Sequence, residues 1–259
     1  MRREFSKNTI ISRSIRSVPP LLRLFCFPHA GGGASMFNDW QHALPPQVEL
    51  CAIQLPGREN RVREVPHRHM NPLVESIVCE LDDLMDLPFA FFGHSMGASL
   101  IFEMTRHLRR SGRPQPVHLY VSGCKDPSND SNDDLIRSDL PEPQFIAYLK
   151  EIGGTPEEVF ESKELLKIML PVLRADFEVL ETYEHIVERP LECPITAFSG
   201  ADDEIVTSED MQEWRKHTNG NFRLKIFPGG HFFVRDAKNQ VISELSISLG
   251  SVMAENGQV

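Results

Sequence analysis

Short apolar runs along the chain alternate with longer stretches in which apolar residues recur every three or four positions. Runs of the first kind, bounded by Gly, Pro or polar residues, predict strands at residues 21–27, 48–55, 87–91, 117–122, 195–199 and 222–227. Stretches of the second kind predict helices at residues 37–44, 72–85, 98–108 and 240–253. Strands that alternate with helices are typical of a parallel sheet covered on both faces, so the pattern predicts the α/β class.

The alternation stops between residues 126 and 192, where no strand pattern occurs. A polar loop is followed there by helical patterns at residues 143–152, 157–160 and 165–183. An all-helical insertion between two strands of a parallel sheet is best explained as a lid over the strand ends, with a merely longer crossover as the alternative. We therefore expect a single domain over residues 21–259 with a helical lid at about residues 130–190.

Composition narrows the class of partner. The 259 residues are 41% hydrophobic with a formal net charge of −10, which suits one globular domain and argues against nucleic acid as the main partner. No run approaches the roughly 20 apolar residues that span a bilayer, and the start of the chain lacks the apolar core of a secretory signal. Five scattered cysteines without a CxxC spacing indicate reduced thiols. We expect a cytoplasmic monomer that binds neither nucleic acid nor membrane, with a disordered or loosely attached tail over residues 1–20.

The strongest chemical signal is the sequence Gly-His-Ser-Met-Gly at residues 93–97. It directly follows an apolar strand pattern and precedes a helical one. A strand that reverses sharply into a helix leaves no room for side chains beside the turn, which explains Gly93 and Gly97. The serine between them is held outward at the top of a sheet, above a helix N-terminus. Ser95 is therefore predicted to be the nucleophile of a hydrolase.

A serine hydroxyl needs a base to remove its proton, and the base needs an acid to orient it. In this architecture the order along the chain is Ser, then acid, then His. His231 lies on a loop just after the last predicted strand, preceded by two glycines, and is the predicted base. For the acid we favour Asp203, which follows the penultimate strand, over its neighbour Asp202. Asp126, after the preceding strand, is a more distant alternative.

The oxyanion of the reaction needs two backbone N–H donors. We expect Met96 N–H, at the helix start, to be one, and Ala30 N–H, in the glycine-rich loop after the first strand, to be the other, with Gly31 as its alternative. This loop lacks the Lys-Ser/Thr of a Walker motif and the spacing of a dinucleotide fingerprint, which disfavours a phosphate-binding loop. His94 is interpreted as structural, with its side chain pointing away around the turn. Nothing in the sequence indicates a metal.

Five motifs taken together resemble those of the type II thioesterases. They occur in the order typical of that family at residues 27–32, 55–59, 93–97, 173–177 and 228–233, and the resemblance covers roughly residues 20–250. These are the stand-alone editing enzymes of polyketide synthases and nonribosomal peptide synthetases, related to the mammalian medium-chain fatty-acid thioesterase. The resemblance implies an α/β-hydrolase fold. It implies Asp203 as the acid of a Gly-x-x-Asp motif, although the adjacent Asp202 leaves the choice open.

The resemblance also implies a substrate, namely an acyl group held as a thioester on the phosphopantetheine arm of an acyl or peptidyl carrier protein. Its release would clear stalled or mis-primed units, and no cofactor of the enzyme itself is implied. Such a substrate needs an apolar slot for the acyl chain and a tunnel for the arm. Apolar lid residues are candidates for the slot and equally for the core of the lid, namely Phe145, Leu149, Leu170, Leu173 and Phe177.

Two other functions remain as alternatives. A small-ester or lipid esterase would use the same three side chains but would need no docking surface for a carrier. A noncatalytic hydrolase-fold module that binds a partner or ligand should have lost Ser95, Asp203 or His231, and all three are present.

A locally basic stretch stands out in this acidic chain, formed by Arg58, Arg61, Arg63 and Arg68. One interpretation is that it meets the phosphate of the arm or an acidic carrier surface. The other, equally good, is a solvated loop paired with nearby glutamates, Glu59 and Glu64. In the helical insertion, a bracing role for the lid is the simple interpretation of Arg174 and Asp176.

Overall fold

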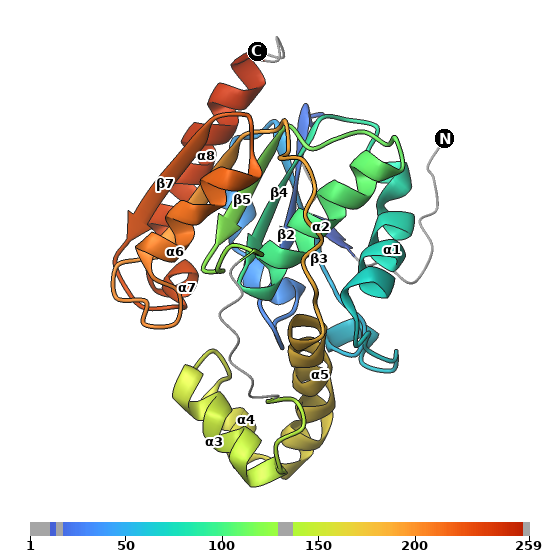
Figure 1. Cartoon of the computed structure of the whole chain (residues 1–259), viewed down its shortest axis with the longest axis vertical. Helices are drawn as coiled ribbons and strands as arrows, with labels where there is room; N and C mark the ends of the chain where they lie inside the picture. The colour runs from blue at the N-terminus through green and yellow to red at the C-terminus, as the bar shows by residue number, and fades with distance from the viewer. Residues whose placement is uncertain (1–10, 14–17, 129–136, 256–259) are drawn as a thin grey trace.

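The computed structural model describes residues 11–13, 18–128 and 137–255, and its centre is a seven-stranded sheet (Figure 1). The strand order is β1-β3-β2-β4-β5-β6-β7, and all neighbouring pairs from β3 to β7 are parallel. The six strands expected from the sequence are all present, which confirms the α/β class. They are β2 (Leu22–Phe27), β3 (Val48–Ile53), β4 (Phe89–His94), β5 (His118–Ser122), β6 (Ile195–Gly200) and β7 (Phe222–Phe227).

The seventh strand, β1 (Ile11–Arg13), departs from the expectation of a loosely attached tail over residues 1–20. It pairs antiparallel with β3, with Ile11 opposite Ile53, and forms one edge of the sheet. Three residues are too few to show a periodic pattern, so the sequence gives no strand signal there. Residues 1–10 and 14–17 of the predicted tail lie outside the described residues.

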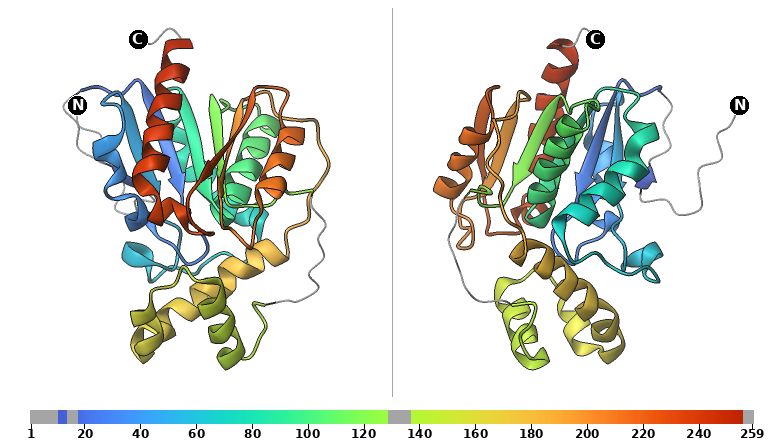
Figure 2. Two further views of the ribbon diagram at one scale, coloured as in Figure 1. Left: turned by 90° about the vertical axis from the view of Figure 1, so that its left-hand side faces the viewer. Right: turned by 45° about the vertical axis from the view of Figure 1, so that its right-hand side comes forward.

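The two faces of the sheet bury two separate hydrophobic clusters, because successive side chains of a strand point to opposite faces. In β2, Phe25 and Phe27 belong to the cluster under α1, α2 and α6, whereas Leu24 and Cys26 belong to the cluster under α8. Figure 2 shows these helices covering opposite sides of the sheet. Their bounds are α1 (Met70–Leu81), α2 (Met96–Arg110), α6 (Ser208–Gln212) and α8 (Lys238–Glu255). A short further helix, α7 (Phe233–Asp236), precedes α8.

One predicted helix takes a different form. The stretch expected to be helical at residues 37–44 folds as two 3₁₀ turns, Ala34–Phe37 and Trp40–Ala43. Asn38 and Asp39 separate the two turns, and such residues favour turns over helix interiors because their side chains compete for backbone hydrogen bonds. Further 3₁₀ turns occupy Glu59–Arg61, Asp82–Leu84 and Glu213–His217.

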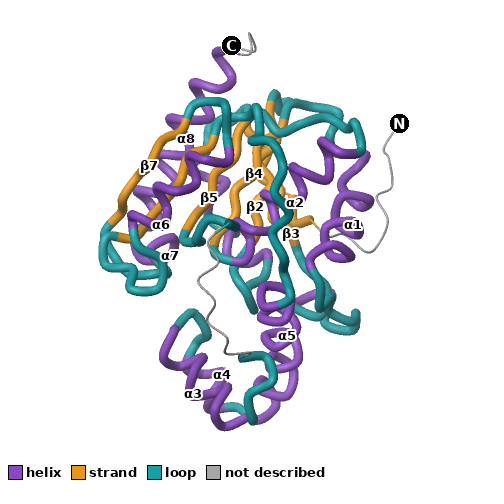
Figure 3. The backbone as a smooth tube through the Cα atoms, in the orientation of Figure 1, coloured by secondary structure: helices purple, strands orange, loops and turns teal. Residues whose placement is uncertain are grey.

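Between β5 and β6 the described residues form three helices and no strand, as the sequence predicts. The helices are α3 (Glu142–Ile152), α4 (Glu157–Glu161) and α5 (Lys163–Glu181). Figure 3 shows them together beyond one end of the sheet, with α5 closest to it. The insertion has a small core of its own around Phe145 and Leu149 of α3 and Leu170 and Leu173 of α5. We refer to α3–α5 as the lid.

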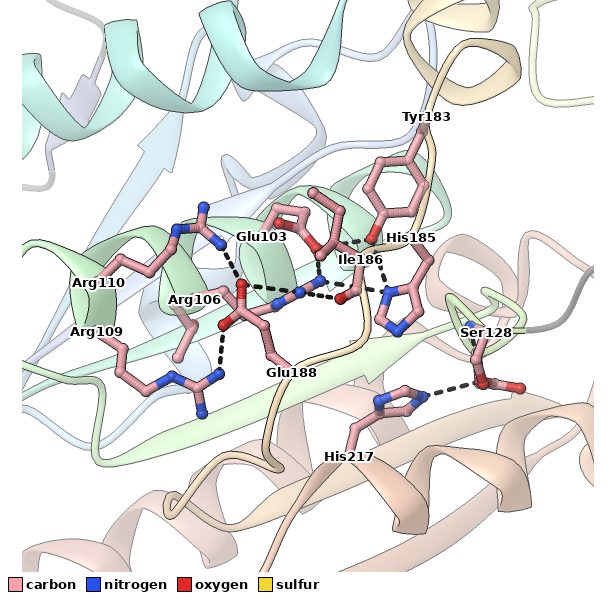
Figure 4. A network of polar contacts seen from close by, with 12 residues as sticks. Glu103, Arg106, Arg109, Arg110, Ser128, Tyr183, His185, Ile186, Glu188 and His217 are labelled. Carbon is pink, nitrogen blue, oxygen red and sulfur yellow. Dashed lines mark hydrogen bonds and ion pairs between the residues drawn. The ribbon is translucent and has the colours of Figure 1, made fainter.

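The segment at residues 182–194 leads back from α5 to β6 and is fastened to α2 by a polar network (Figure 4). Tyr183 donates a hydrogen bond to Glu103 of α2, with 2.7 Å between the oxygens. Burial alone would raise the pKa of Glu188, but hydrogen bonds from α2 outweigh it and lower that pKa to about 2. The donors are Arg106 at 3.0 Å, Arg109 at 2.7 Å and Arg110 at 2.7 Å. The exit of the lid is thus anchored on the helix that begins directly after Ser95.

Candidate active site

Ser95 lies in the sharp turn between β4 and α2, with a strained backbone at φ 53° and ψ −119°. The two glycines of the motif are required sterically, as expected. A Cβ at Gly93 would overlap the carbonyl group of Gly97, and a Cβ at Gly97 would overlap the carbonyl oxygen of Phe27 in β2. A non-glycine residue held at positive φ is uncommon and persists only where its surroundings enforce it. The fold therefore presents the Ser95 side chain on a rigid turn.

His231 and Asp203 are joined by a hydrogen bond, although 28 positions separate them in the chain. Nδ1 of His231, on the loop after β7, donates to Oδ2 of Asp203, after β6, over 2.9 Å. The other carboxylate oxygen accepts two backbone N–H groups, from Ile205 and Val206, each at 2.9 Å. Burial would raise the pKa of Asp203, but these hydrogen bonds and the nearby His231 outweigh it and lower that pKa. Asp203 is thus an ionised, fully hydrogen-bonded acceptor.

The two alternatives for the acid lie elsewhere. Asp202 is exposed, and its backbone N–H donates to the carbonyl of Gly229 at 3.0 Å. Asp126 accepts a hydrogen bond from Nε2 of a different histidine, His217, at 2.9 Å. Of the three candidate carboxylates, the structure therefore brings only Asp203 to His231.

Ser95, Met96, Ala30 and His231 all line one cavity of about 250 Å³. Its remaining wall is largely apolar and comes mainly from the lid. Of the five lid residues suggested for an acyl slot, three line it: Leu149, Leu173 and Phe177. The other two, Phe145 and Leu170, belong to the core of the lid. Further wall residues gave no recognisable sequence signal, namely Tyr148, Ile152, Leu180, Cys124, Lys125, Ile205 and Val206, whereas Phe232 belongs to the motif at residues 228–233.

A second cavity of about 350 Å³ lies beside the first on the other side of the glycine-rich loop. The two share four lining residues, namely His29, Ala30, Gly154 and Thr155. The second cavity continues along residues 31–33 and 57–59 and is closed on the lid side by Ile168, Met169 and Val172. Two adjoining spaces thus meet at Ala30, close to the nucleophile turn.

The glycine-rich loop has most of its polar groups satisfied. Gly31 N–H donates to Oδ2 of Asp176 at 2.7 Å, and Gly32 N–H donates to the carbonyl of His29 at 2.9 Å. Nδ1 of His29 donates to the carbonyl of Ala30 at 2.8 Å, and burial lowers the pKa of this histidine, which favours its neutral form. For Ala30 N–H, the described part of the chain offers no acceptor. Gly31 N–H is thus occupied, whereas Ala30 N–H is open.

His94 differs from the expectation that its side chain points away from the site. Its ring lies against that of His231, with 5.3 Å between the ring centroids, and its Nδ1 is 3.0 Å from Oγ of Ser122. Complete burial lowers the pKa of His94 well below its usual value. A neutral, buried ring that packs behind His231 supports the structural interpretation, although its direction was predicted wrongly.

Most arginines of the basic stretch form ion pairs with carboxylates of the same chain. Arg58 is buried and binds Asp176 through both terminal nitrogens, at 2.6 and 2.8 Å. Arg61 is also buried and pairs with Glu64 at 2.6 Å, while Arg68 pairs with Glu178 of α5. Three of the four arginines therefore have carboxylate partners within the protein, which disfavours a binding surface. Of the partners expected for a solvated loop, only Glu64 is used, and Arg58 and Arg61 are buried rather than solvated.

A strained serine between a strand and a helix shares a cavity at the edge of the parallel sheet with a histidine that is hydrogen-bonded to an aspartate. This arrangement defines the α/β-hydrolase class. Residues 22–249 match the family described as Thioesterase domain, and the chain belongs to that family.

The chain is 45% identical over 236 residues to the gramicidin S biosynthesis protein GrsT of Aneurinibacillus migulanus, covering 90% of this chain and 91% of that protein. Among solved structures, RedJ, the thioesterase of the prodiginine pathway in Streptomyces coelicolor, superposes with a TM-score of 0.83 at 37% identity, covering 90% and 94% of the two chains. YbtT, a type II thioesterase of the yersiniabactin pathway, superposes with a TM-score of 0.81 at 28% identity, covering 94% and 99%. The resemblance to type II thioesterases is thereby confirmed.

Within residues 11–13, 18–128 and 137–255, no group of three or more His, Cys, Asp or Glu side chains could hold a metal ion. None of the helices in these ranges is long and apolar enough to cross a membrane.

Proposed function

We propose that this thioesterase releases acyl groups from the phosphopantetheine thioesters of carrier proteins, with Ser95, His231 and Asp203 as its catalytic residues. The observation that supports these roles best is the 2.9 Å hydrogen bond between Asp203 and His231, since His231 lines the cavity that also holds Ser95. Because Nδ1 of His231 is engaged by Asp203, the proton of the neutral ring lies on Nδ1 and Nε2 is left as the base.

In the first half-reaction, Oγ of Ser95 attacks the thioester carbonyl while Nε2 of His231 takes the hydroxyl proton. The carbonyl oxygen becomes an oxyanion in a tetrahedral intermediate. That intermediate collapses when the carbon–sulfur bond breaks, and His231 returns its proton to the departing thiolate. The products are an acyl ester on Ser95 and the free thiol of the carrier arm.

In the second half-reaction, water attacks the acyl ester while His231 accepts one of its protons. The new tetrahedral intermediate expels Oγ of Ser95, which takes the proton back from His231, and the carboxylic acid leaves. Asp203 stays ionised throughout and stabilises the imidazolium that forms in each half. This role fits the lowered pKa of its carboxyl group.

Met96 N–H and Ala30 N–H are the proposed donors to the oxyanion. Met96 is the first residue of α2, where backbone N–H groups have no acceptor within the helix. Ala30 N–H is an open donor of the glycine-rich loop, and Ala30 lines the same cavity as Ser95. Each such donor contributes about 10²- to 10³-fold to the rate.

The two adjoining cavities suit a substrate with two unlike halves. We assign the largely apolar cavity of about 250 Å³ to the acyl chain, because lid side chains such as Leu149 and Phe177 line it. We assign the cavity of about 350 Å³ to the carrier arm, because it adjoins the first at Ala30. Carrier proteins as partners are supported by the biosynthetic pathways of the relatives. A monomeric state and a cytoplasmic location stay predictions from the sequence.

The direct test is incubation of the enzyme with an acyl-loaded carrier protein, followed by intact mass spectrometry of the carrier. The wild type should remove the acyl group, and Ser95→Ala should lower the rate by about 10³-fold or more because no nucleophile remains. A wild type that leaves the carrier loaded but cleaves simple esters would replace this proposal by the esterase function. A folded protein that turns over neither substrate would favour a binding module.

A further inference from the structure

Helix α5 of the lid contacts the glycine-rich loop at Gly31. The carboxylate of Asp176 accepts the Gly31 N–H at 2.7 Å. One turn earlier on α5, the Leu173 side chain fills the space where a Cβ of Gly31 would lie. Gly31 also has φ +75°, a conformation that other residues rarely adopt. The contact therefore depends on a glycine at this position and on two α5 residues that share one helix face.

Arg58 binds both Asp176 and the glycine-rich loop. Its guanidinium binds both carboxylate oxygens of Asp176, at 2.6 and 2.8 Å, and its Nη1 also donates to the carbonyl of Gly32 at 3.1 Å. The two charged side chains are only 8% and 3% exposed. Desolvation makes a buried ion pair a poor source of net stability compared with apolar residues of the same volume. A purely bracing role thus does not explain why a charged pair occupies this position.

The hydrogen bonds fix the peptide plane next to the open donor. The carbonyl end of the peptide between Ala30 and Gly31 accepts from His29 at 2.8 Å, and its N–H end donates to Asp176 at 2.7 Å. With both ends held, this plane cannot rotate without breaking a hydrogen bond. Ala30 N–H belongs to the preceding peptide, whose carbonyl, that of His29, accepts the Gly32 N–H at 2.9 Å. With both neighbouring planes held, the Ala30 N–H points in one direction.

From this geometry we propose that Asp176, oriented by Arg58, is a positioning residue for the oxyanion hole, so that docking of α5 sets the direction of the Ala30 N–H. The inference rests on the proposed function, in which Ala30 is an oxyanion donor. It extends the bracing role expected from the sequence, because the carboxylate acts on the reaction through Gly31. A lid whose α5 moves away from Gly31 would lose part of its oxyanion stabilisation.

Two variants separate positioning from stability. Arg58→Met combined with Asp176→Leu replaces the buried pair by apolar side chains and leaves no unpaired charge, so its melting temperature should stay near that of the wild type. Asp176→Asn leaves the Arg58 charge without its full partner and should be less stable than the double variant. However, Asp176→Asn keeps a carbonyl oxygen for Gly31 N–H, whereas the double variant removes that acceptor.

We therefore expect the two variants to rank in opposite orders by melting temperature and by kcat. The double variant should have the higher melting temperature of the two but the lower kcat, reduced by about 10- to 100-fold because an oxyanion donor is misaligned rather than deleted. KM should change little. The affinity for butylboronic acid, which forms a tetrahedral adduct with the active serine, should fall by a similar factor of about 10 to 100. Titration of active serines with a fluorophosphonate normalises kcat for the fraction of folded enzyme.

Glu178→Gln is the matched control, because it removes another ion pair of α5, with Arg68, two positions beyond Asp176. Its kcat should stay near that of the wild type. A kcat that follows the melting temperatures across the variants, or a double variant with wild-type kcat, would overturn the inference. If the wild type hydrolyses the carrier thioester and Ser95→Ala does not, such a result refutes the positioning role alone. Absence of hydrolysis by the wild type would instead refute the proposed function.

Discussion

The described residues contain two Asp–His pairs with hydrogen bonds of the same length. His231 and Asp203 lie after β7 and β6 and are joined over 2.9 Å. Asp126, after β5, is joined to His217 over the same 2.9 Å. Of the first pair, His231 lines the cavity with Ser95, whereas His217 of the second pair lies beside the network that fastens residues 182–194 to α2 (Figure 4). A hydrogen-bonded Asp–His pair alone is therefore no indication of catalysis.

The two histidines differ in the nitrogen that meets the carboxylate. His231 donates through Nδ1, the nitrogen nearer the backbone, which leaves the outer Nε2 to face a substrate. His217 donates through Nε2, so its outer nitrogen is consumed by Asp126. Its ring also packs against Phe102 and Trp214, with centroids 5.1 and 5.7 Å away. In a Ser–His–Asp arrangement the carboxylate holds Nδ1 and leaves Nε2 as the base, and His231 has this geometry whereas His217 does not.

The largest difference between the pairs should come from removing each histidine. His231→Ala should lower kcat by about 10³- to 10⁵-fold, because Ser95 loses its base. His217→Ala should leave kcat near the wild-type value and reduce only the melting temperature. Steady-state hydrolysis of an acyl thioester, with thermal melting of each variant, measures both. A comparable loss of kcat in both variants would mean that the second pair also takes part in the reaction.

Replacing the aspartate of each pair by asparagine should give a smaller difference in kcat between the two pairs. Asp203→Asn should lower kcat by about 10²- to 10⁴-fold, because the imidazolium loses its counter-charge and the ring its orientation. Asp126→Asn should keep kcat and cost about 1–2 kcal/mol of unfolding free energy, since the partly buried hydrogen bonds from His217 and Ser128 lose a charged acceptor. Urea unfolding of both variants beside kinetic assays provides the comparison. Unchanged kcat in Asp203→Asn would contradict the assigned acid.

The smallest effect concerns the pH dependence of stability, which the two pairs should share. Burial would raise the pKa of Asp126, but hydrogen bonds from His217 and Ser128 lower it to about 2. A carboxyl group with a folded-state pKa below its unfolded value of about 3.9 stabilises the fold above pH 4, and this contribution disappears as the pH falls towards 2. Asp203 has a lowered pKa and should act in the same direction.

Between pH 6 and pH 3, the wild type should therefore lose about 1 kcal/mol more unfolding free energy than Asp126→Asn does. Urea unfolding at the two pH values measures this difference. An equal loss in both proteins would show that the Asp126 carboxyl group titrates normally in the folded state.

The sequence alone determined the features that depend on neighbouring residues. The alternation of short apolar runs and helical stretches predicted six of the seven strands and the helical insertion. The turn at residues 93–97 predicted the position of Ser95, because the steric need for Gly93 and Gly97 is local to that turn. His231 followed from the same kind of reasoning, as a residue just beyond the last strand. Short or irregular segments such as β1 carried too few residues to show a pattern.

The tertiary structure decided between candidates that are equivalent in the chain. Asp202 and Asp203 are adjacent carboxylates, and only the direction of each side chain at the end of β6 assigns one to His231. Ala30 and Gly31 are adjacent N–H donors, and Asp176 occupies the second one.

The ion pair of Arg58 shows why some features follow from the sequence and others only from the tertiary structure. Its partner Asp176 lies 118 positions further along the chain, on a helix whose place over the sheet depends on how the whole lid packs. Sequence patterns reflect the steric and periodic requirements of turns, strands and helices, and these requirements involve only a few neighbouring residues. Hydrogen bonds and ion pairs between distant segments depend on the packing of those segments against each other, so only the folded chain specifies them.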